Sequence, residues 1–120
     1  MHSVMFIFKR QNHLTLEEFY EHYEHVHGPI ARRLKGLIEY RQHPTRKPGV
    51  GDGAYMSKEA PYDAASVYTF ESPEAAEKAW ISDVGKELDI DTYKLMDTKT
   101  MISLPIAIRE VISHSNKFFL

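Results

Sequence analysis

The segment 16–40 constrains the fold of this chain more than any other. Apolar or aromatic side chains recur there at helical spacing, at positions 16, 19, 20, 23, 26, 30 and 34. The stripe contains the tripeptide His27-Gly28-Pro29. Proline lacks an amide proton and clashes with the preceding turn, so we expect the helix to kink or restart at Pro29. Gly36 should end the helix as a left-handed cap. The segment therefore predicts a helix packed on a sheet, with an ionisable imidazole at its break.

Four segments have the composition of β-strands: 3–10, 37–43, 64–70 and 100–111. In the first, Met5 and Ile7 should share one face, while Val4, Phe6 and Phe8 share the other. Both faces are apolar, so we expect this strand to be covered on both sides. The last segment contains a proline at 105, which lacks a ladder donor and indicates a bulge or an edge strand.

Helix boundaries are also readable in the sequence. Thr15 and Glu18 have the spacing of a capping box at the start of the first helix. Ser72, followed by proline, should open the second helix, because a serine cap and a first-turn proline suit a helix start. We expect Gly85 to break that helix and residues 86–96 to form a short third one.

The resulting order is β-α-β-β-α-β, which is that of the ferredoxin-like α+β fold. Such a fold has a four-stranded antiparallel sheet with helices on one face only, and its other apolar face needs a cover. We therefore expect a homodimer whose sheets close face to face. Residues 1–112 should form the domain. Residues 44–62 should form a long loop, and residues 113–120 either an exposed tail or a clasp on a partner subunit.

Composition excludes several classes of function. The chain has 120 residues and a formal net charge of −2, so it has no electrostatic footprint for nucleic acid or an anionic membrane. No apolar run is long enough to span a membrane, and the first residues lack the features of a secretory signal. The absence of cysteine excludes thiolate chemistry and fits a reducing compartment, so we expect a cytoplasmic protein.

Histidines 22, 25 and 27 suggest a metal cluster at first sight, but helical geometry argues against one. Residues 22 and 25 should lie on the polar side of the helix, and residues 25 and 27 do not converge. We therefore expect no metal ion and no organic cofactor.

Several of these segments together resemble a known family. The pattern comprises FKR near the start, the helix LTLEEFYEHYEHVHGPIARRLKGLIEY, and SPEAAEKAW after a strand. In this pattern the chain is similar to the EthD-like family of the dimeric α/β-barrel superfamily, over about residues 1–112. The resemblance implies the same fold and a small-molecule site in each barrel. The loop at 44–62 and the tail depart from the pattern, which leaves the substrate open.

His27 is the first candidate for a catalytic group. It lies at the edge of the apolar stripe, where a partly desolvated imidazole can move protons near pH 7. Tyr20 and Tyr23 precede it at helical spacing and are candidates for substrate contact. A structural histidine that caps the carbonyls freed by Pro29 is the alternative. The resemblance supports the catalytic role, because related muconolactone methylisomerases use a histidine at this position.

Two residues on the second strand complete the candidate site. By resemblance, Tyr40 would point into the barrel and orient a substrate oxygen; a core aromatic is the alternative. His43 should lie on the opposite face from Tyr40 unless the chain bends at Pro44. Asp63 and Asp97 could hold a histidine, or could serve as a strand-edge charge and a cap.

Three functions remain open from the sequence. The first is a cofactor-independent lyase or isomerase that acts on a cyclic, aromatic or polyketide-like carbonyl compound, with His27 as general acid/base and Tyr40 assisting. The second is a cofactor-independent monooxygenase of quinols. The third is a non-catalytic dimeric protein that binds a small apolar or aromatic ligand for a partner.

Overall fold

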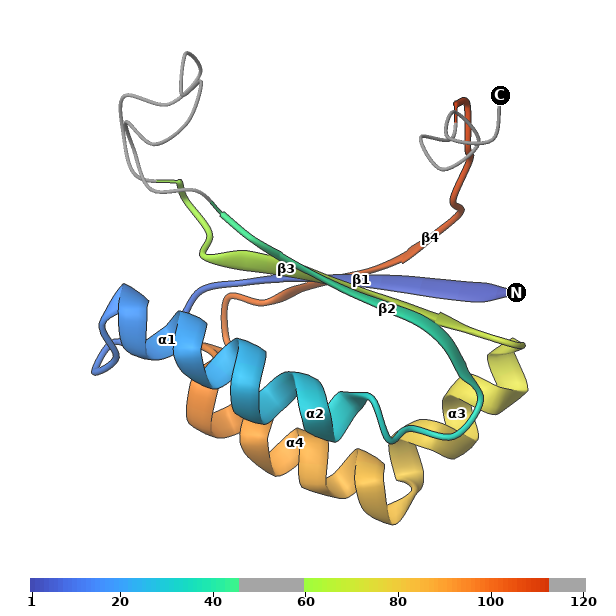
Figure 1. Ribbon diagram of the computed structural model, residues 1–120, viewed down its shortest axis with the longest axis horizontal. Helices are drawn as coiled ribbons and strands as arrows, with labels where there is room; N and C mark the ends of the chain where they lie inside the picture. The colour runs from blue at the N-terminus through green and yellow to red at the C-terminus, as the bar shows by residue number, and fades with distance from the viewer. Residues whose placement is uncertain (46–59, 113–120) are drawn as a thin grey trace.

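The computed structural model describes residues 1–45 and 60–112 and has the predicted ferredoxin-like order. The strands are β1 (His2–Phe8), β2 (Leu37–Pro44), β3 (Ala64–Phe70) and β4 (Ile102–Ile106). They form one antiparallel sheet in the order β2-β3-β1-β4. The helices lie along one face of this sheet (Figure 1).

The first helical stretch consists of three consecutive pieces. These are α1 (Leu16–His22), the π-helix η1 (Tyr23–His27) and α2 (Gly28–Ala31). Thr15 and Glu18 form the predicted capping box. Gly36 has a positive φ of 84°, but the expectation that it caps the helix was wrong, because α2 ends at Ala31 with Arg32 as its C-cap and Gly36 lies in the turn before β2. The restart near Pro29 is confirmed, since α2 begins at Gly28 with proline in its first turn. The π-helix was not predicted, and it changes which side chains share a face.

The second helical stretch divides at a different residue from the one predicted. Helix α3 (Pro73–Ile81) ends before Ser82, whose side chain caps α4 (Asp83–Leu95). The expectation of a break at Gly85 was wrong, because this glycine lies inside α4. A Cβ there would come within 2.3 Å of the Ala79 carbonyl oxygen, so glycine allows the two helices to meet closely.

The last strand is shorter than the expected 100–111. It covers Ile102–Ile106 and pairs only with β1, where Pro105 lies opposite Val4. Pro105 therefore stands in an edge strand, as its missing amide proton predicted. The greater part of the loop at 44–62 and the whole tail at 113–120 lie outside the described residues.

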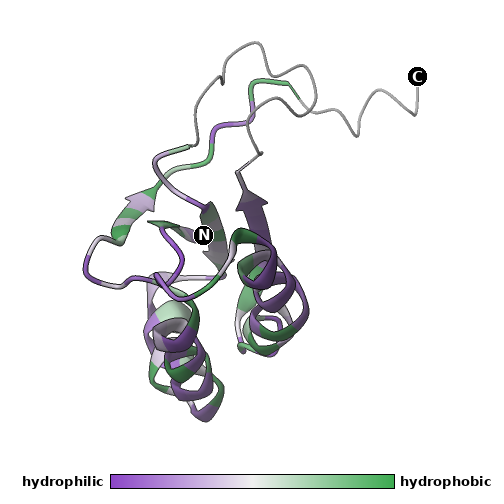
Figure 2. Cartoon of the chain, turned by 90° about the vertical axis from the view of Figure 1, so that its left-hand side faces the viewer, coloured by the Kyte–Doolittle hydropathy of each residue, from purple (hydrophilic) through white to green (hydrophobic). Residues whose placement is uncertain are grey.

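The helices cover one face of the sheet and leave the other face open. The side chains of Phe6, Phe8 and Tyr68 point toward the helices and join two aromatic-rich cores there. In a view from the side, the helices stand as two columns under this same face (Figure 2). The opposite face carries alternate residues of β1 and β4, such as Met5 paired with Leu104, which is 41% exposed. The described helices leave this apolar face without a cover.

In the part of the chain that the structure describes, no helix has the length and apolar character needed to cross a bilayer.

Candidate functional site

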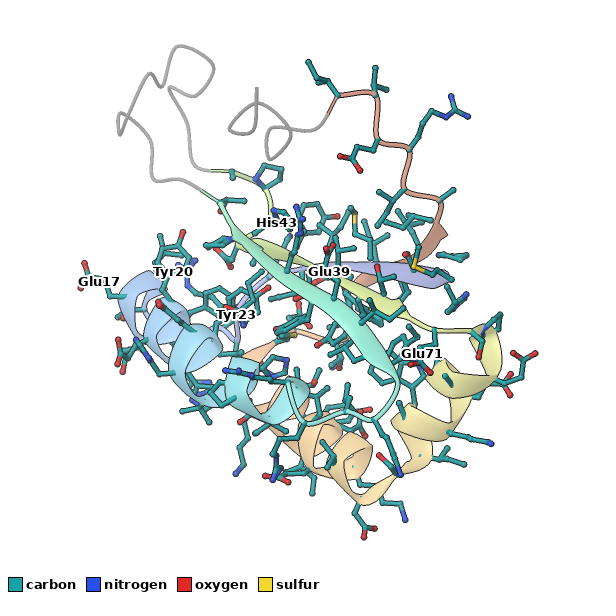
Figure 3. The ribbon with its side chains drawn as sticks, turned by 45° about the vertical axis from the view of Figure 1, so that its right-hand side comes forward. Glu17, Tyr20, Tyr23, Glu39, His43 and Glu71 are labelled. Atoms are coloured by element: carbon teal, nitrogen blue, oxygen red, sulfur yellow. The ribbon has the colours of Figure 1, made fainter. Side chains whose placement is uncertain are left out.

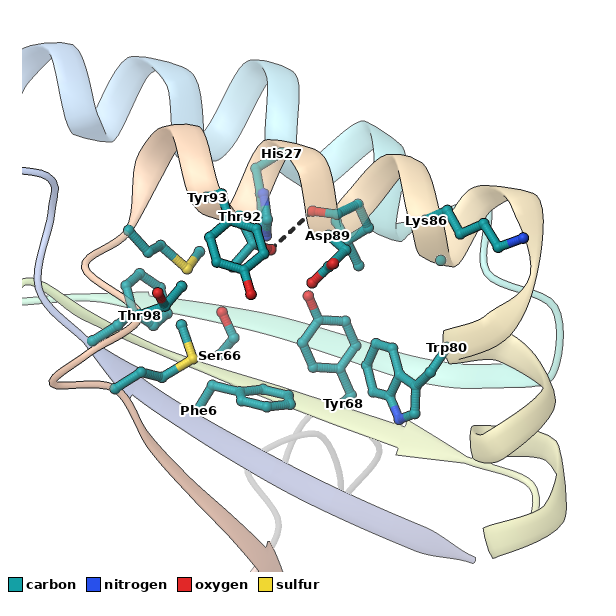
Figure 4. Close-up of a pocket in the computed structure, with 15 residues that line it drawn as sticks. Phe6, His27, Ser66, Tyr68, Trp80, Lys86, Asp89, Thr92, Tyr93 and Thr98 are labelled. Carbon is teal, nitrogen blue, oxygen red and sulfur yellow. Dashed lines mark hydrogen bonds between the residues drawn. The ribbon is translucent and has the colours of Figure 1, made fainter.

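A cavity of about 610 Å³ lies between the sheet and helix α4 (Figure 4). Its floor is aromatic, with Phe6 and Phe8 from β1, Tyr68 from β3, and Trp80 from α3. Polar side chains of α4, among them Lys86 and the neighbouring Asp89, line another side (Figure 4). This size and lining are typical of sites for small organic molecules.

His27 lines this cavity and is almost fully buried, with 2% of its surface exposed. It ends the π-helix, close to the ring of Tyr23, whose centroid lies 6.0 Å away. Its Nδ1 makes a hydrogen bond of 2.8 Å to Oδ2 of Asp91, a buried residue of α4. The structure thus places the predicted histidine beside a cavity and gives it a carboxylate partner.

His22 contacts the other oxygen of the same carboxylate. Its Nε2 lies 2.7 Å from Asp91 Oδ1, so one aspartate bridges two histidines. Residues five apart diverge on an α-helix, but the wider turn of a π-helix returns them to nearly the same face. The Gly28 amide donates to the Tyr23 carbonyl, which is the five-residue step that makes this possible. The π-helix therefore builds the bridge.

The bridge fixes the tautomer of His27. An ionised carboxylate can only accept hydrogen bonds, so the Nδ1 atom of His27 must carry the proton. The other ring nitrogen, Nε2, is then an unprotonated acceptor when the ring is neutral. The hydrogen bond that the described residues make to this ring is the one at Nδ1, and His27 lines the cavity. A histidine held in this way is equipped to accept a proton from a bound molecule.

Asp91 remains ionised in this setting. Burial raises the pKa of its carboxyl group, but the hydrogen bonds from His27 and His22 lower it more, and the net pKa is lowered. The bridge therefore places a permanent negative charge behind His27. Such a charge stabilises an imidazolium when the ring accepts a proton.

Tyrosines surround the sheet side of the site. Tyr23 shares a hydrogen bond of 2.6 Å with the Ser66 hydroxyl and donates to the Ala65 carbonyl at 3.2 Å. The ring of Tyr40 stacks on Tyr68, with centroids 4.6 Å apart. Burial raises the pKa of the hydroxyls of Tyr23, Tyr40 and Tyr68, so they remain protonated at neutral pH.

The predicted site residues do not all meet. Tyr40 lies behind Tyr68 on the edge strand, where it lines a separate hollow of about 630 Å³ and accepts a hydrogen bond from Gln42. Tyr20 donates to the Thr45 carbonyl at the end of β2. His43 is exposed and points away from the helices, because β2 continues without a bend (Figure 3). Of the predicted residues, His27 alone lines the cavity.

The two aspartates that the sequence offered as histidine partners have other roles. Asp63 pairs with the guanidinium of Arg10 at 2.7 Å, at the end of the sheet. Asp97 accepts from Lys99 and Thr100 within its own turn. Asp63 is therefore a charge at the edge of the sheet and Asp97 caps a turn, which were the alternative roles that the sequence allowed.

Asp91 was missed, although the sequence carries a signal for it. It interrupts an apolar stripe of α4 that runs through Val84, Leu88 and Leu95, and both of these leucines are buried. A carboxylate inside such a stripe has to be paired, because an isolated buried charge is costly.

Within residues 1–45 and 60–112, no three histidines or carboxylates are arranged to hold a metal ion.

The fold and the cavity define a class of small ferredoxin-like proteins with a site between sheet and helices. A profile of the EthD domain matches residues 11–99. The chain therefore belongs to the EthD domain family. No curated protein sequence matches it significantly.

Solved structures share the fold at low identity. An EthD family protein from Bacillus halodurans is 19% identical with a TM-score of 0.69, over 91% of this chain and 100% of that one. A dimeric ferredoxin-like protein of unknown function from Thermobifida fusca is 11% identical with a TM-score of 0.66, over 89% and 90%. A putative antibiotic biosynthesis monooxygenase from Nitrosomonas europaea is 9% identical with a TM-score of 0.59, over 89% and 97%. These likenesses show the fold, and two of the three proteins carry no stated reaction.

Proposed function

We propose that this protein is a cofactor-independent lyase or isomerase in which His27 is the general acid/base. The observation that carries the proposal is the hydrogen bond of 2.8 Å between His27 Nδ1 and Asp91, in a residue that lines the cavity. With the proton on Nδ1, Nε2 of the neutral ring is the nitrogen that can accept a proton. Two further observations support the proposal. The chain belongs to the EthD family, and its fold encloses a cavity of a size suited to a small organic molecule.

The reaction begins with proton transfer from carbon. Nε2 takes a proton from the carbon next to a substrate carbonyl, and the electron pair of the broken C–H bond moves into an enolate. The imidazolium that forms is paired with the Asp91 carboxylate. Returning the proton to another carbon completes an isomerisation, and expelling a leaving group from the enolate completes an elimination. One positioned general base typically contributes about 10²–10⁴-fold in rate.

The cavity lining indicates the substrate class. Phe6, Phe8 and Trp80 present aromatic faces or edges, and Met96 and Met101 add pliable apolar contacts. About 610 Å³ accommodates one or two fused rings with substituents. We therefore propose a cyclic, aromatic or polyketide-like carbonyl compound.

Hydron exchange tests the proposal without knowledge of the natural substrate. The probe is 1-tetralone, a bicyclic aromatic ketone, in deuterated buffer near pH 7, and proton NMR follows the loss of the signal next to the carbonyl. We expect the wild type to accelerate exchange and His27→Gln to remove about 10²-fold or more of that acceleration. His25→Gln is the matched control, because His25 is exposed on the same helix. Equal exchange by the wild type and His27→Gln contradicts the proposal.

An oxidative function is the second candidate. The same aromatic floor suits a quinol, and one protein of similar fold is described as a putative antibiotic biosynthesis monooxygenase. Oxygen consumption on addition of 1,4-dihydroxynaphthalene, corrected for spontaneous oxidation, separates this function from the first. If neither oxygen uptake nor hydron exchange occurs while the ligands bind, the non-catalytic binding function stands.

We also propose that the functional unit is a homodimer of the domain formed by residues 1–112. The apolar face with Met5, Val67 and Leu104 needs a cover, and proteins with this fold include dimeric ones. On β2, charged residues Glu39 and Arg41 border this face, as a polar rim borders many interfaces.

A further inference from the structure

We infer that Tyr68 is the residue that binds the carbonyl oxygen of the substrate, which extends the proposed function and depends on it. The sequence favoured Tyr40 for this role. Tyr68 lines the cavity that His27 lines, whereas Tyr40 lines a different hollow. In the close-up, the hydroxyl of Tyr68 points from the sheet toward helix α4, on the cavity side (Figure 4).

The ring of Tyr68 is held from several directions. Tyr40 stacks on it at 4.6 Å between centroids, and Trp80 and Phe6 contact it edge to face at 5.3 and 5.7 Å. Only 3% of its surface is exposed. A ring clamped in this way holds its hydroxyl in one position before a ligand arrives, and prior alignment of a donor is what stabilises a developing oxyanion.

The chemistry of the hydroxyl suits the role. Burial raises the pKa of Tyr68 well above its ordinary value, so the group stays an O–H donor and does not compete with the substrate as an anion. Ser66, two residues earlier on β3, lines the same floor but is engaged by Tyr23 at 2.6 Å. The Tyr68 hydroxyl would therefore hold the oxygen of a flat ketone at β3, with the neighbouring carbon on the side of the cavity that His27 lines.

Binding measurements test this assignment separately from catalysis. Trp80 is the chain's one tryptophan and lines the cavity, so its fluorescence reports binding without a label. The probes are 1-tetralone and tetralin, which differ by the carbonyl oxygen. We expect Tyr68→Phe to reduce the preference for the ketone about fivefold to tenfold, which corresponds to one lost hydrogen bond. Tyr20→Phe, the matched control, should keep the preference, because Tyr20 donates to the Thr45 carbonyl and is not among the residues that line the cavity.

The outcomes separate the two proposals. An unchanged preference for 1-tetralone in Tyr68→Phe overturns the assignment of Tyr68, whatever the hydron exchange shows. A reduced preference supports the assignment even if His27→Gln leaves exchange intact, in which case only the proposed reaction fails. Where exchange is catalysed, Tyr68→Phe should lower its rate at saturating ketone about 10²-fold. A loss of that size in Tyr40→Phe but not in Tyr68→Phe overturns the assignment as well.

Discussion

His22 and His27 are five residues apart, yet they bind the two oxygens of a single carboxylate. The distances to Asp91 are 2.7 Å from His22 and 2.8 Å from His27. His22 is about one-third exposed and His27 is buried, so the bridge joins the protein surface to the cavity wall. A π-helical turn, a feature often found at functional sites, produces this convergence.

Replacing Asp91 by asparagine should destabilise the protein by about 1–3 kcal/mol. The amide can accept from His27 Nδ1, but its NH₂ group then replaces the carboxylate oxygen that faces His22 Nε2, so a charge-assisted hydrogen bond is lost. Urea unfolding measures the change. Glu87→Gln is the control, because this half-exposed residue of α4 pairs only at the surface with Arg33 and should cost less than about 1 kcal/mol. A loss in Asp91→Asn no larger than that control contradicts the paired geometry.

Acid should remove the contribution of Asp91 to stability. Its pKa in the folded protein is lowered from 3.8, so its stabilising effect is complete above that value and disappears as the pH falls through the folded pKa. Between about pH 4.5 and pH 2.5, the difference in melting temperature between the wild type and Asp91→Asn should therefore shrink. Calorimetry at intervals of half a pH unit follows it. A difference that widens on acidification in this window contradicts the assignment.

Gly85→Ala should be markedly destabilising, by about 1–3 kcal/mol. The added Cβ would lie 2.3 and 2.4 Å from the carbonyl oxygens of Ala79 and Trp80, and backbone atoms cannot yield as a side chain can. Gly28→Ala is the matched control, because its Cβ would meet the flexible Gln42 amide at 3.1 Å. Chemical denaturation of both variants checks the difference, and equal losses would argue against close contact between α3 and α4.

Charge on the open sheet face should break the homodimer. Leu104→Glu places a carboxylate on an edge-strand position that is 41% exposed in the single chain, so the chain itself should still fold. Sedimentation equilibrium should give twice 13.9 kDa for the wild type and 13.9 kDa for the variant. Ile81→Glu, at an exposed position of α3 away from this face, should remain dimeric. A wild type that sediments as a single chain refutes the dimer.

The order of strands and helices could be predicted because its signals are local. The capping box at Thr15 depends on a few neighbouring residues and is confirmed. Gly36 has the left-handed backbone that a glycine in a turn favours, but the helix it was expected to cap ends at Ala31. The misplaced break at Gly85 also came from a local signal: glycine favours a helix end, whereas in the structure Ser82 separates α3 from α4 and caps α4.

The site was less predictable because it depends on pairing between distant elements. Tyr40 was selected from the sequence and Tyr68 was not considered, because only the register that places the two tyrosines opposite each other shows that the central strand carries Tyr68. The bridge through Asp91 likewise needs α4 to lie against the π-helix. No spacing rule for an α-helix brings His22 and His27 together.

The most direct test of the account is a nitrogen-15 NMR spectrum of the histidine rings at pH 8, recorded with and without 1-tetralone. The account predicts that His27 carries its proton on Nδ1, and that the ligand shifts the resonance of Nε2, while His27→Gln identifies the signals by their loss. A proton on Nε2, or an Nε2 resonance that saturating ligand leaves unmoved, would contradict the role of His27 in the cavity.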